Sequence, residues 1–341
     1  MYESFYGLTG KPFQLNPDPS FFFGSKGHSS AYSYLKYGVF QGEGFIVVTG
    51  EIGAGKTTLV RTLLDELDPR KVVAVQLVST QLEADDLLRS VATAFGLPVR
   101  GTDKAQLLAT IEAFLTSLVT EHKRALLVVD EAQNLSPRAM EELRMLSNFQ
   151  LGDRALLQSF LVGQPELREL LRGPSMQQLR QRVIASYHLG PMDEEETRGY
   201  IEHRLHRVGW KDDPRFEPAV FQAIYRATGG IPRKINLLCN RLLLASYLAE
   251  KHAIDQADVD AVIGELRAED GIDVPVQSQA ATIPEEGGRP DNVVRSFAFS
   301  SIAARLDRLE KTVNAMHELL RSMAGSPDRR PKTGGRPGRG V

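Results

Sequence analysis

The sequence predicts an α/β fold, in which a mostly parallel sheet carries helices on both faces, followed by a small all-helical domain. Up to residue 192, short apolar runs alternate with helical patterns, and this alternation favours parallel strands joined by crossover helices. From residue 193 on, helical patterns alone follow. A glycine-rich stretch also joins the first predicted strand to the next helix, a junction where many α/β folds bind phosphate groups.

Each element of the predicted α/β domain has its own signal. Buried strands are expected where short apolar runs are bounded by polar residues or glycine, at 45–49, 72–78, 125–129 and 156–162. Helices are expected in the intervals, at 56–67, 84–95, 103–122 and 137–150. Ser136 before Pro137 supports the last of these, because serine caps helix N-termini and proline fits the first turn. In the helical domain, residues 193–267, helices are expected at 194–208, 218–228, 233–251 and 256–266.

Composition excludes several classes of protein. A chain of 341 residues with 42% hydrophobic residues has the length of about two domains, and it is neither wholly disordered nor collagen-like. No stretch approaches the roughly 18 apolar residues of a membrane helix, so no membrane insertion is expected. We expect a cytoplasmic chain, either free or peripheral to the inner membrane. Cys239 is the single cysteine, which excludes an intrachain disulfide and predicts a small buried residue on a helix.

The net charge of −2 hides an uneven distribution beyond residue 267. Residues 268–296 contain six acidic and two basic residues among glycine, proline and alanine, and they predict a flexible linker. Residues 324–341 contain five basic residues and one acidic residue, and they predict a disordered tail. Residues 297–323 predict a coiled-coil helix, because apolar residues repeat at alternating spacings of four and three. These residues are Ile302, Leu306, Leu309, Val313, Met316, Leu320 and Met323.

The glycine-rich stretch at residues 50–57 fits the phosphate-loop pattern G-x-x-x-x-G-K-[ST] in full. Its glycines allow torsions that turn successive N–H groups toward phosphate oxygens, and the following helix adds the positive end of its dipole. Lys56 is expected to reach the β- and γ-phosphates of ATP, and Thr57 is expected to ligate Mg²⁺. The predicted nucleotide-binding residues are Gly50, Glu51, Ile52, Gly53, Ala54, Gly55, Lys56, Thr57 and Thr58.

Two acidic residues end the third predicted strand. Asp130 and Glu131 follow an apolar run, so we expect them at the carboxyl edge of the sheet, where α/β folds bind ligands. Asp130 is then placed to hold Mg²⁺ together with Thr57, and Glu131 to polarise an attacking water. With the phosphate loop, this pair predicts Mg²⁺-dependent ATP hydrolysis.

With these motifs and a trailing helical domain, residues 1–267 resemble the AAA+ ATPases, and more narrowly the ExeA-type group, the general secretion pathway protein A family. The matching residues are 5–8, 11–13, 17–19, 50–58, 130–133, 162–167 and 229–233. The resemblance implies a three-layer P-loop domain with a helical lid, and ATP and Mg²⁺ as cofactors. Residues 2–8 and 42–46 are most similar to the ATPase associated with exosortase/PEP-CTERM systems, which implies a link to exopolysaccharide gene clusters.

The resemblance also implies roles for residues outside the two motifs. Gln164, after the fourth predicted strand, matches a polar sensor that orients the attacking water. Arg233 matches the second sensor, at the start of a lid helix. His28 and the helix at 32–37 are expected to contribute to the adenine pocket.

Two further arginines match the position of an arginine finger, which reaches the nucleotide site of a neighbouring subunit. These are Arg180 and Arg182, and Arg182 fits better because it directly precedes an apolar run. If the finger acts in trans, a lone subunit has an incomplete site. The resemblance therefore implies a homo-oligomer, and the predicted coiled coil is a candidate for bringing subunits together.

The predicted function is that of an ATP-hydrolysing switch or motor that serves an exopolysaccharide or exosortase-type envelope export system through a protein partner. The alternative is an ATP-dependent DNA-binding regulator similar to transposition AAA+ proteins, with the basic tail at 324–341 contacting phosphates. We do not favour DNA, because residues 1–267 are mildly acidic. A superfamily-2 helicase would need a second RecA-like domain, and the remaining sequence predicts none.

Overall fold

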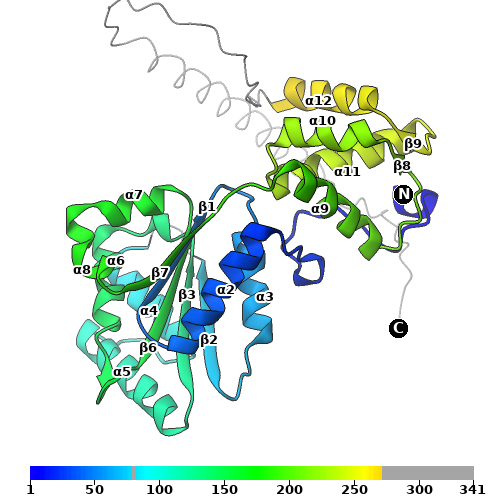
Figure 1. Ribbon diagram of the computed structural model, residues 1–341. Coiled ribbons are helices and arrows are strands. Elements are labelled where there is room, and N and C mark those ends of the chain that lie inside the picture. The colour runs from blue at the N-terminus through cyan, green and yellow to red at the C-terminus, as the bar shows by residue number, and fades with distance from the viewer. Residues whose placement is uncertain (79–81, 271–341) are drawn as a thin grey trace, which may run out of the picture. The chain divides into compact units, whose positions relative to one another are not determined.

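The structure is a computed structural model that describes residues 1–78 and 82–270 (Figure 1). The predicted coiled coil at 297–323 and the basic tail at 324–341 lie outside the described residues, as does the predicted acidic linker from residue 271 on. The described residues belong to one compact unit, in which an α/β part is followed by a helical lid.

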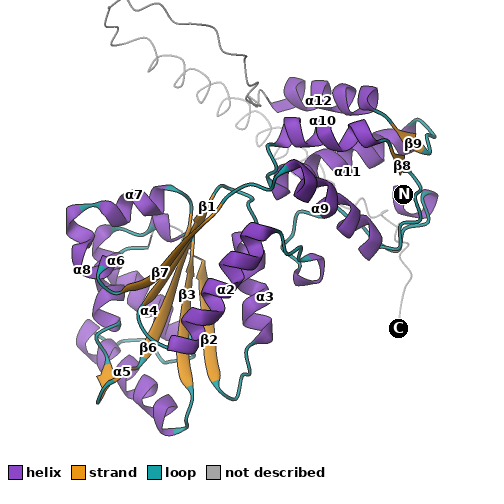
Figure 2. Ribbon diagram, in the orientation of Figure 1, coloured by secondary structure: helices purple, strands orange, loops and turns teal. Residues whose placement is uncertain are grey.

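Within the described residues, a five-stranded parallel sheet organises the α/β part (Figure 2). Its neighbouring strands are parallel throughout. In spatial order they are β2 (Val72–Val78), β3 (Arg124–Asp130), β6 (Leu157–Gly163), β1 (Phe45–Gly50) and β7 (Val183–Leu189). Because the carboxyl ends of parallel strands meet at one edge, the residues that follow β3, β6 and β1 lie side by side.

Helices cover both faces of the central strands, as predicted. Along β1, Ile46 and Val48 pack with α2 (Lys26–Gln41) and α3 (Lys56–Glu66). Phe45 and Val47 point to the opposite face, since successive side chains of a strand alternate. That face is covered by α4 (Ala84–Ala94), α5 (Lys104–Thr120), α6 (Pro137–Leu146), α7 (Glu166–Arg172) and α8 (Gln177–Arg180). The α/β part therefore has three layers.

The sequence predicted four of the five strands of this sheet and missed β7. This strand lies at the edge of the sheet and is paired only with β1 among the described strands. Ala185 and Tyr187 pack toward α2, whereas Ile184 and His188 are exposed. A strand that is covered on one face only needs no continuous apolar run, so its sequence lacks the signal of a buried strand.

The chain between α6 and β6 also differs from the prediction. The helix expected at 137–150 ends at Leu146, and a two-stranded hairpin of β4 (Gln150–Leu151) and β5 (Arg154–Ala155) follows. The predicted helix start is confirmed, because the Ser136 hydroxyl accepts a hydrogen bond from the Ala139 N–H at 3.2 Å.

The lid, residues 193–270, is helical as predicted, except for one short pair of strands that the prediction of an all-helical domain missed. Its helices are α9 (Glu194–Arg207), α10 (Pro218–Thr228), α11 (Pro232–Leu248) and α12 (Gln256–Asp270), joined by a short pair of strands, β8 (Arg215–Phe216) and β9 (Ala253–Ile254). Asp193 and Glu196 form a capping box at the start of α9, each side chain accepting the other's backbone N–H. Cys239 is fully buried on α11, as expected.

The first thirteen residues pack into the core of the lid rather than into the α/β part. They include the short helix α1 (Tyr2–Phe5). The Tyr2 hydroxyl donates to Asn240 Oδ1 at 2.9 Å on α11. The side chains buried in the lid core are Tyr2, Tyr6, Leu8 and Phe13. The predicted domain at 1–192 therefore begins with a segment whose side chains belong to the lid core.

Candidate functional site

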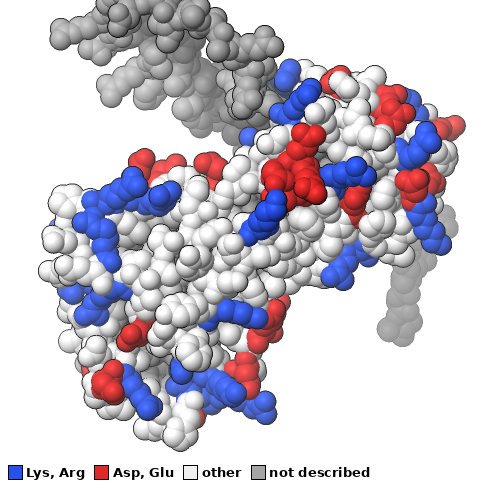
Figure 3. Space-filling view, viewed as in Figure 1, with Lys and Arg blue, Asp and Glu red and all other residues white. Residues whose placement is uncertain are grey.

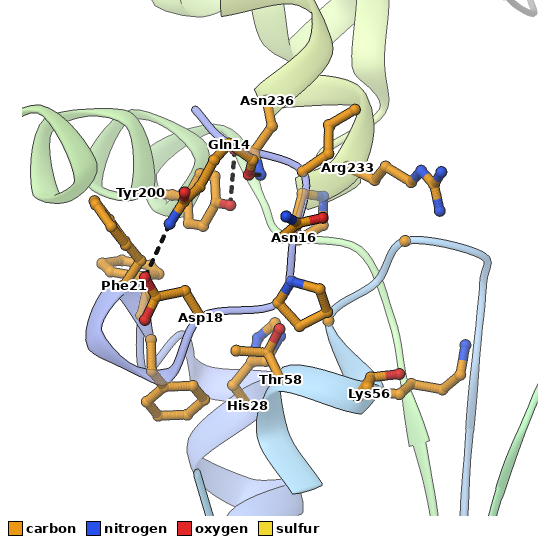
Figure 4. A pocket seen from close by; sticks show the side chains of 18 of the residues that line it. Gln14, Asn16, Asp18, Phe21, His28, Lys56, Thr58, Tyr200, Arg233 and Asn236 are labelled. Carbon is orange, nitrogen blue, oxygen red and sulfur yellow. Dashed lines mark hydrogen bonds between the residues drawn. The ribbon is translucent and has the colours of Figure 1, made fainter. Parts of the chain in front are cut away.

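A pocket of about 190 Å³ lies at the carboxyl edge of the sheet, where the phosphate loop, the lid and an N-terminal segment meet (Figure 4). We call this segment, residues 14–23, the N-terminal strap. It passes between lid residues and the phosphate loop in Figure 4. Of the predicted site residues, those that line the pocket are His28, Ile52, Gly53, Gly55, Lys56, Thr57, Thr58, Glu131 and Arg233.

Glycines in the phosphate loop are required by torsion and by packing. Gly53 and Gly55 have φ of 82° and 96°, a region that residues with a Cβ rarely adopt. A Cβ on Gly53 would lie 2.3 Å from the Cβ of Arg233, and one on Gly50 would lie 2.5 Å from the carbonyl oxygen of Leu189. The loop therefore fits closely between β7 and the lid.

Lys56 is the first residue of α3, and its side chain is buried in the loop. Its Nζ donates to the carbonyl oxygens of Gly50 at 2.7 Å and Glu51 at 3.0 Å. Burial lowers the pKa of Lys56, against the opposing effect of the Glu131 and Asp130 carboxylates. A phosphate in the loop would offer this ammonium a negatively charged acceptor, which attracts it more strongly than a neutral carbonyl does.

Thr57 and Asp130 meet as the predicted metal site requires. The Thr57 hydroxyl donates to Oδ2 of Asp130 at 2.9 Å, and Gln76 on β2 donates to the same oxygen at 3.4 Å. Burial raises the pKa of Asp130 despite hydrogen bonds from Thr57 and the Glu131 N–H, so a divalent cation here would offset the cost of its charge. Hydroxyl and carboxylate oxygens are ligands that Mg²⁺ prefers, with phosphate and water completing its shell. The residues present therefore fit Mg²⁺ bound with a nucleotide.

Glu131 is held by two glutamine amides. Its backbone has a φ of 53°, and its Oε2 accepts hydrogen bonds from Gln133 at 2.6 Å and Gln164 at 3.1 Å. Burial raises the pKa of Glu131, but these two hydrogen bonds and the charge of Lys56 together lower it below its usual value. The carboxylate is thus kept ionised, as a general base must be.

The structure brings Gln164 to Glu131 and adds Gln133, which sequence reasoning did not assign a role. The Oε1 of Gln133 accepts the backbone N–H of Gln164 at 3.0 Å, so the two amides hold each other as well as Glu131. An amide two residues after a strand-ending acid was the available signal. It becomes meaningful only when β6 is placed beside β3.

Arg204 of α9 ties the strap and the residue Pro12 before it to the lid. Its Nε donates to the carbonyl oxygen of Pro12 at 2.6 Å, and its guanidinium carbon lies 4.6 Å from the centre of the Phe21 ring. Its Nη1 donates to the Tyr200 hydroxyl at 2.8 Å, which donates in turn to Asn236 at 2.9 Å. Arg204, Tyr200 and Asn236 all line the pocket. Sequence reasoning missed them, because each is an ordinary helix residue until the strap packs on the lid.

Of the residues predicted to contribute to the adenine pocket, His28 lies at the pocket and the helix at 32–37 does not line it, while adenine binding itself stays a prediction. Tyr34 instead packs against Tyr187 of β7, and the Tyr37 hydroxyl accepts a hydrogen bond from Gln41. The reason is geometric: α2 presents its first turn to the pocket, and its later turns run along the sheet. Residues of the strap line the pocket instead.

The three predicted arginines lie in different places. Arg233 lines the pocket from α11, and its backbone N–H donates to the Gly53 carbonyl oxygen at 3.1 Å. Arg180 and Arg182 lie just before β7, and the Arg182 carbonyl accepts the N–H of Phe45, the first residue of β1. The phosphate loop follows the other end of β1, roughly 16 Å of strand away. Neither Arg180 nor Arg182 is therefore placed at the pocket of its own chain.

Comparison with known proteins agrees with this geometry. Residues 39–171 match the model of a family described as AAA domain. The fold is similar to that of Cdc6p from Pyrobaculum aerophilum, with a TM-score of 0.59 and 16% identity over 76% of this chain and 71% of that chain. It is also similar to ORC2 from Aeropyrum pernix in its ADP form, with a TM-score of 0.54 and 17% identity over 70% of this chain and 67% of that chain. The chain has the P-loop AAA+ fold.

One relative has a higher sequence identity than these solved structures. General secretion pathway protein A from Aeromonas hydrophila is 38% identical over 267 residues, which is 78% of this chain. The match covers 48% of that protein, so this chain spans about half its length. Within the matched regions, the chain is therefore similar to an AAA domain and to general secretion pathway protein A.

Proposed function

We propose that the protein binds ATP with Mg²⁺ and hydrolyses it to ADP and phosphate. The observation that carries the proposal is the contact of Thr57 with Asp130 beside a Glu131 carboxylate that two amides hold ionised. The glycine fit of the loop and the ADP form of a structure with the same fold support a nucleotide as the ligand.

In this proposal each residue has a distinct task. The loop N–H groups and Lys56 bind the phosphates, and Thr57 and Asp130 hold Mg²⁺, which when bound neutralises charge on the phosphate oxygens. Glu131 accepts a proton from the attacking water, while Gln164 orients its carboxylate. Arg233 serves as the sensor on the lid.

Replacing the proposed base tests this function. Glu131→Gln keeps the shape of the side chain and removes its basicity, so it should bind ATP like the wild type and release phosphate roughly 100-fold more slowly. The comparison is made by titration with ATP and by steady-state phosphate release. Phosphate release at the wild-type rate would contradict the role of Glu131, and a wild type that does not release phosphate would contradict the proposed activity.

We further propose that the protein works as a homo-oligomer with a protein partner. Across the face shown in Figure 3, basic and acidic side chains of the described residues are interspersed rather than gathered into a basic stripe. Non-specific binding of duplex DNA draws on such a stripe, so this face gives no support for DNA as the partner. Similarity to general secretion pathway protein A supports a partner in an envelope export system, with exosortase-type exopolysaccharide export as the narrower proposal.

No helix among residues 1–78 and 82–270 is long and apolar enough to cross a bilayer. We propose a cytoplasmic site of action, free or at the inner membrane.

The export role is separable from ATP hydrolysis by a genetic test. Deletion of the gene should reduce secreted exopolysaccharide, and the wild-type gene but not Glu131→Gln should restore it. Unchanged secretion after deletion would overturn the export role and leave the ATPase proposal intact.

A further inference from the structure

Two consecutive carbonyl groups of the phosphate loop are held from outside the loop. The N–H of Arg233 on the lid donates to the Gly53 oxygen at 3.1 Å, and Nε2 of His28 on α2 lies 3.0 Å from the Ala54 oxygen. The C=O and N–H groups of one trans peptide unit point in opposite directions. A contact that fixes the Ala54 carbonyl therefore also fixes the N–H of Gly55, a residue that lines the pocket.

The His28 ring is itself held in one orientation. Nδ1 lies 2.7 Å from the Ser25 hydroxyl oxygen, and a carbonyl oxygen can only accept. The tautomer that satisfies both contacts carries its proton on Nε2, donates to Ala54 and accepts from Ser25. His28 is 6% exposed, and burial lowers the pKa of His28 against the opposing effects of the Ala54 hydrogen bond and the Glu196 charge. The imidazole is therefore neutral near pH 7.

The ring and the loop fit each other closely. A Cβ on Gly55 would lie 2.8 Å from His28 Nε2, so the loop passes directly over the ring. The first turn of α2 is also anchored to the lid, because the Lys26 N–H donates to Glu196 at 2.7 Å. The helix turn that carries His28 is thus held at the loop and at the lid.

We propose that His28 is a positioning residue for the phosphate loop, which fixes the Ala54 peptide so that the Gly55 N–H faces the nucleotide phosphates. Ser25 acts with it by holding the ring. This inference rests on the proposed function, since it assumes that the loop binds the phosphates of ATP. It goes beyond the phosphate-loop motif, because His28 lies outside the motif and acts through the loop backbone.

Nucleotide binding tests the proposal. His28→Ala should raise the Kd for ATP about five- to tenfold, the change that loss of one hydrogen bond corresponds to. The Kd for AMP should change less, because AMP lacks the β- and γ-phosphates. His28→Gln should restore ATP binding to within about twofold, since its amide N–H can reach the same carbonyl.

Hydrogen exchange of the loop amides, without nucleotide, gives a readout that is independent of binding. Amides of residues 50–57 should exchange faster in His28→Ala than in the wild type, and His28→Gln should slow them again. Ser33→Ala, an exposed serine on the same helix, is the matched control and should change neither readout.

The outcomes separate the inference from the function. Wild-type exchange and ATP affinity in His28→Ala would overturn the role of His28 and leave the proposed ATPase standing. Equal loss of ATP and AMP binding, with no recovery in His28→Gln, would also overturn it, because that pattern marks general damage to the fold. If the wild type binds ATP without hydrolysing it, the ATPase proposal fails, and the exchange and affinity changes still decide the role of His28.

Discussion

At the residue scale, Glu131 shows how a few contacts tune one carboxylate. The left-handed backbone at Glu131 turns the chain directly after β3, so that its side chain meets amides from η2 (Ala132–Asn134) and from the end of β6. Strain of this kind in a non-glycine residue is found where the surrounding structure fixes it, often at active sites. Burial raises the pKa of Glu131. The two hydrogen bonds and the charge of Lys56 together outweigh this effect, so the pKa is lowered.

Removal of one amide should change the pH dependence of hydrolysis. A base acts when deprotonated, so a lowered pKa keeps Glu131 active at lower pH. Gln164→Leu removes one stabilising hydrogen bond and raises this pKa. We expect the acidic limb of the kcat profile to move to higher pH, with kcat reduced about tenfold.

The measurement is kcat against pH at saturating ATP. Gln178→Leu, an exposed glutamine on α8, is the control and should leave the profile in place. An acidic limb that stays at the wild-type pH in Gln164→Leu would show that Gln164 does not influence Glu131.

At the element scale, α2 depends on a glycine for its approach to the sheet. A Cβ on Gly38 would lie 2.6 Å from Cγ1 of Ile46 on β1, which is closer than side chains pack. The Gly38 carbonyl oxygen also accepts a hydrogen bond from Gln158 of β6 at 2.6 Å. Glycine is unfavourable within a helix, so the close approach of α2 to the sheet is the reason for its presence here.

The same substitution should have opposite effects at two helix positions. Gly38→Ala gains about 1 kcal/mol of helix propensity but overpacks the core at a cost of about 1–3 kcal/mol, so it should lower the free energy of unfolding. Gly264→Ala on α12 meets no atom within 4 Å and should raise that free energy by about 0.5–1 kcal/mol. Urea unfolding measures both, and an increase in both variants would contradict the packing argument.

At the scale of the whole molecule, the pocket is assembled from parts far apart in the sequence. The lid meets the phosphate loop through Arg233, and it meets the first turn of α2 through Glu196. Arg182 lies at the opposite edge of the sheet, where its Nη1 donates to the Ser147 carbonyl oxygen at 2.8 Å. This placement is compatible with a finger that serves a neighbouring subunit, which stays a prediction.

Mixing two inactive variants tests the trans finger. Lys56→Ala cannot bind the phosphates, and Arg182→Ala lacks the finger, so each alone should hydrolyse ATP at least about tenfold more slowly than the wild type. In mixed assemblies, an intact Lys56 site of one subunit can receive Arg182 from the other, and activity should recover. The measurement is phosphate release against mixing ratio.

Arg180→Ala in the same mixing series distinguishes the two candidate fingers. Its Nη1 donates to the Leu171 and Gly173 carbonyl oxygens, so a structural role predicts loss of stability without recovery on mixing. Recovery with Arg180→Ala but not with Arg182→Ala would assign the finger to Arg180. Co-assembly without recovery in both mixtures would contradict a finger in trans.

The sequence by itself determined the layered fold, the lid and the phosphate-loop, Asp130 and Glu131 positions. These follow from local rules, since buried strands and helices have their own periodicity, and the carboxyl ends of parallel strands share one edge. The same rules failed for β7, where one exposed face removes the continuous apolar run, and for the end of α6, where a hairpin follows.

Only the tertiary structure decided what surrounds the phosphate loop. Gln133 and Gln164 meet because β3 and β6 are neighbours, and His28 reaches Ala54 because α2 packs its first turn under the loop. The strap reaches the pocket because the N-terminal residues are buried in the lid core. These contacts join residues that are far apart in the chain. Local sequence patterns do not predict them, because they depend on which elements pack together.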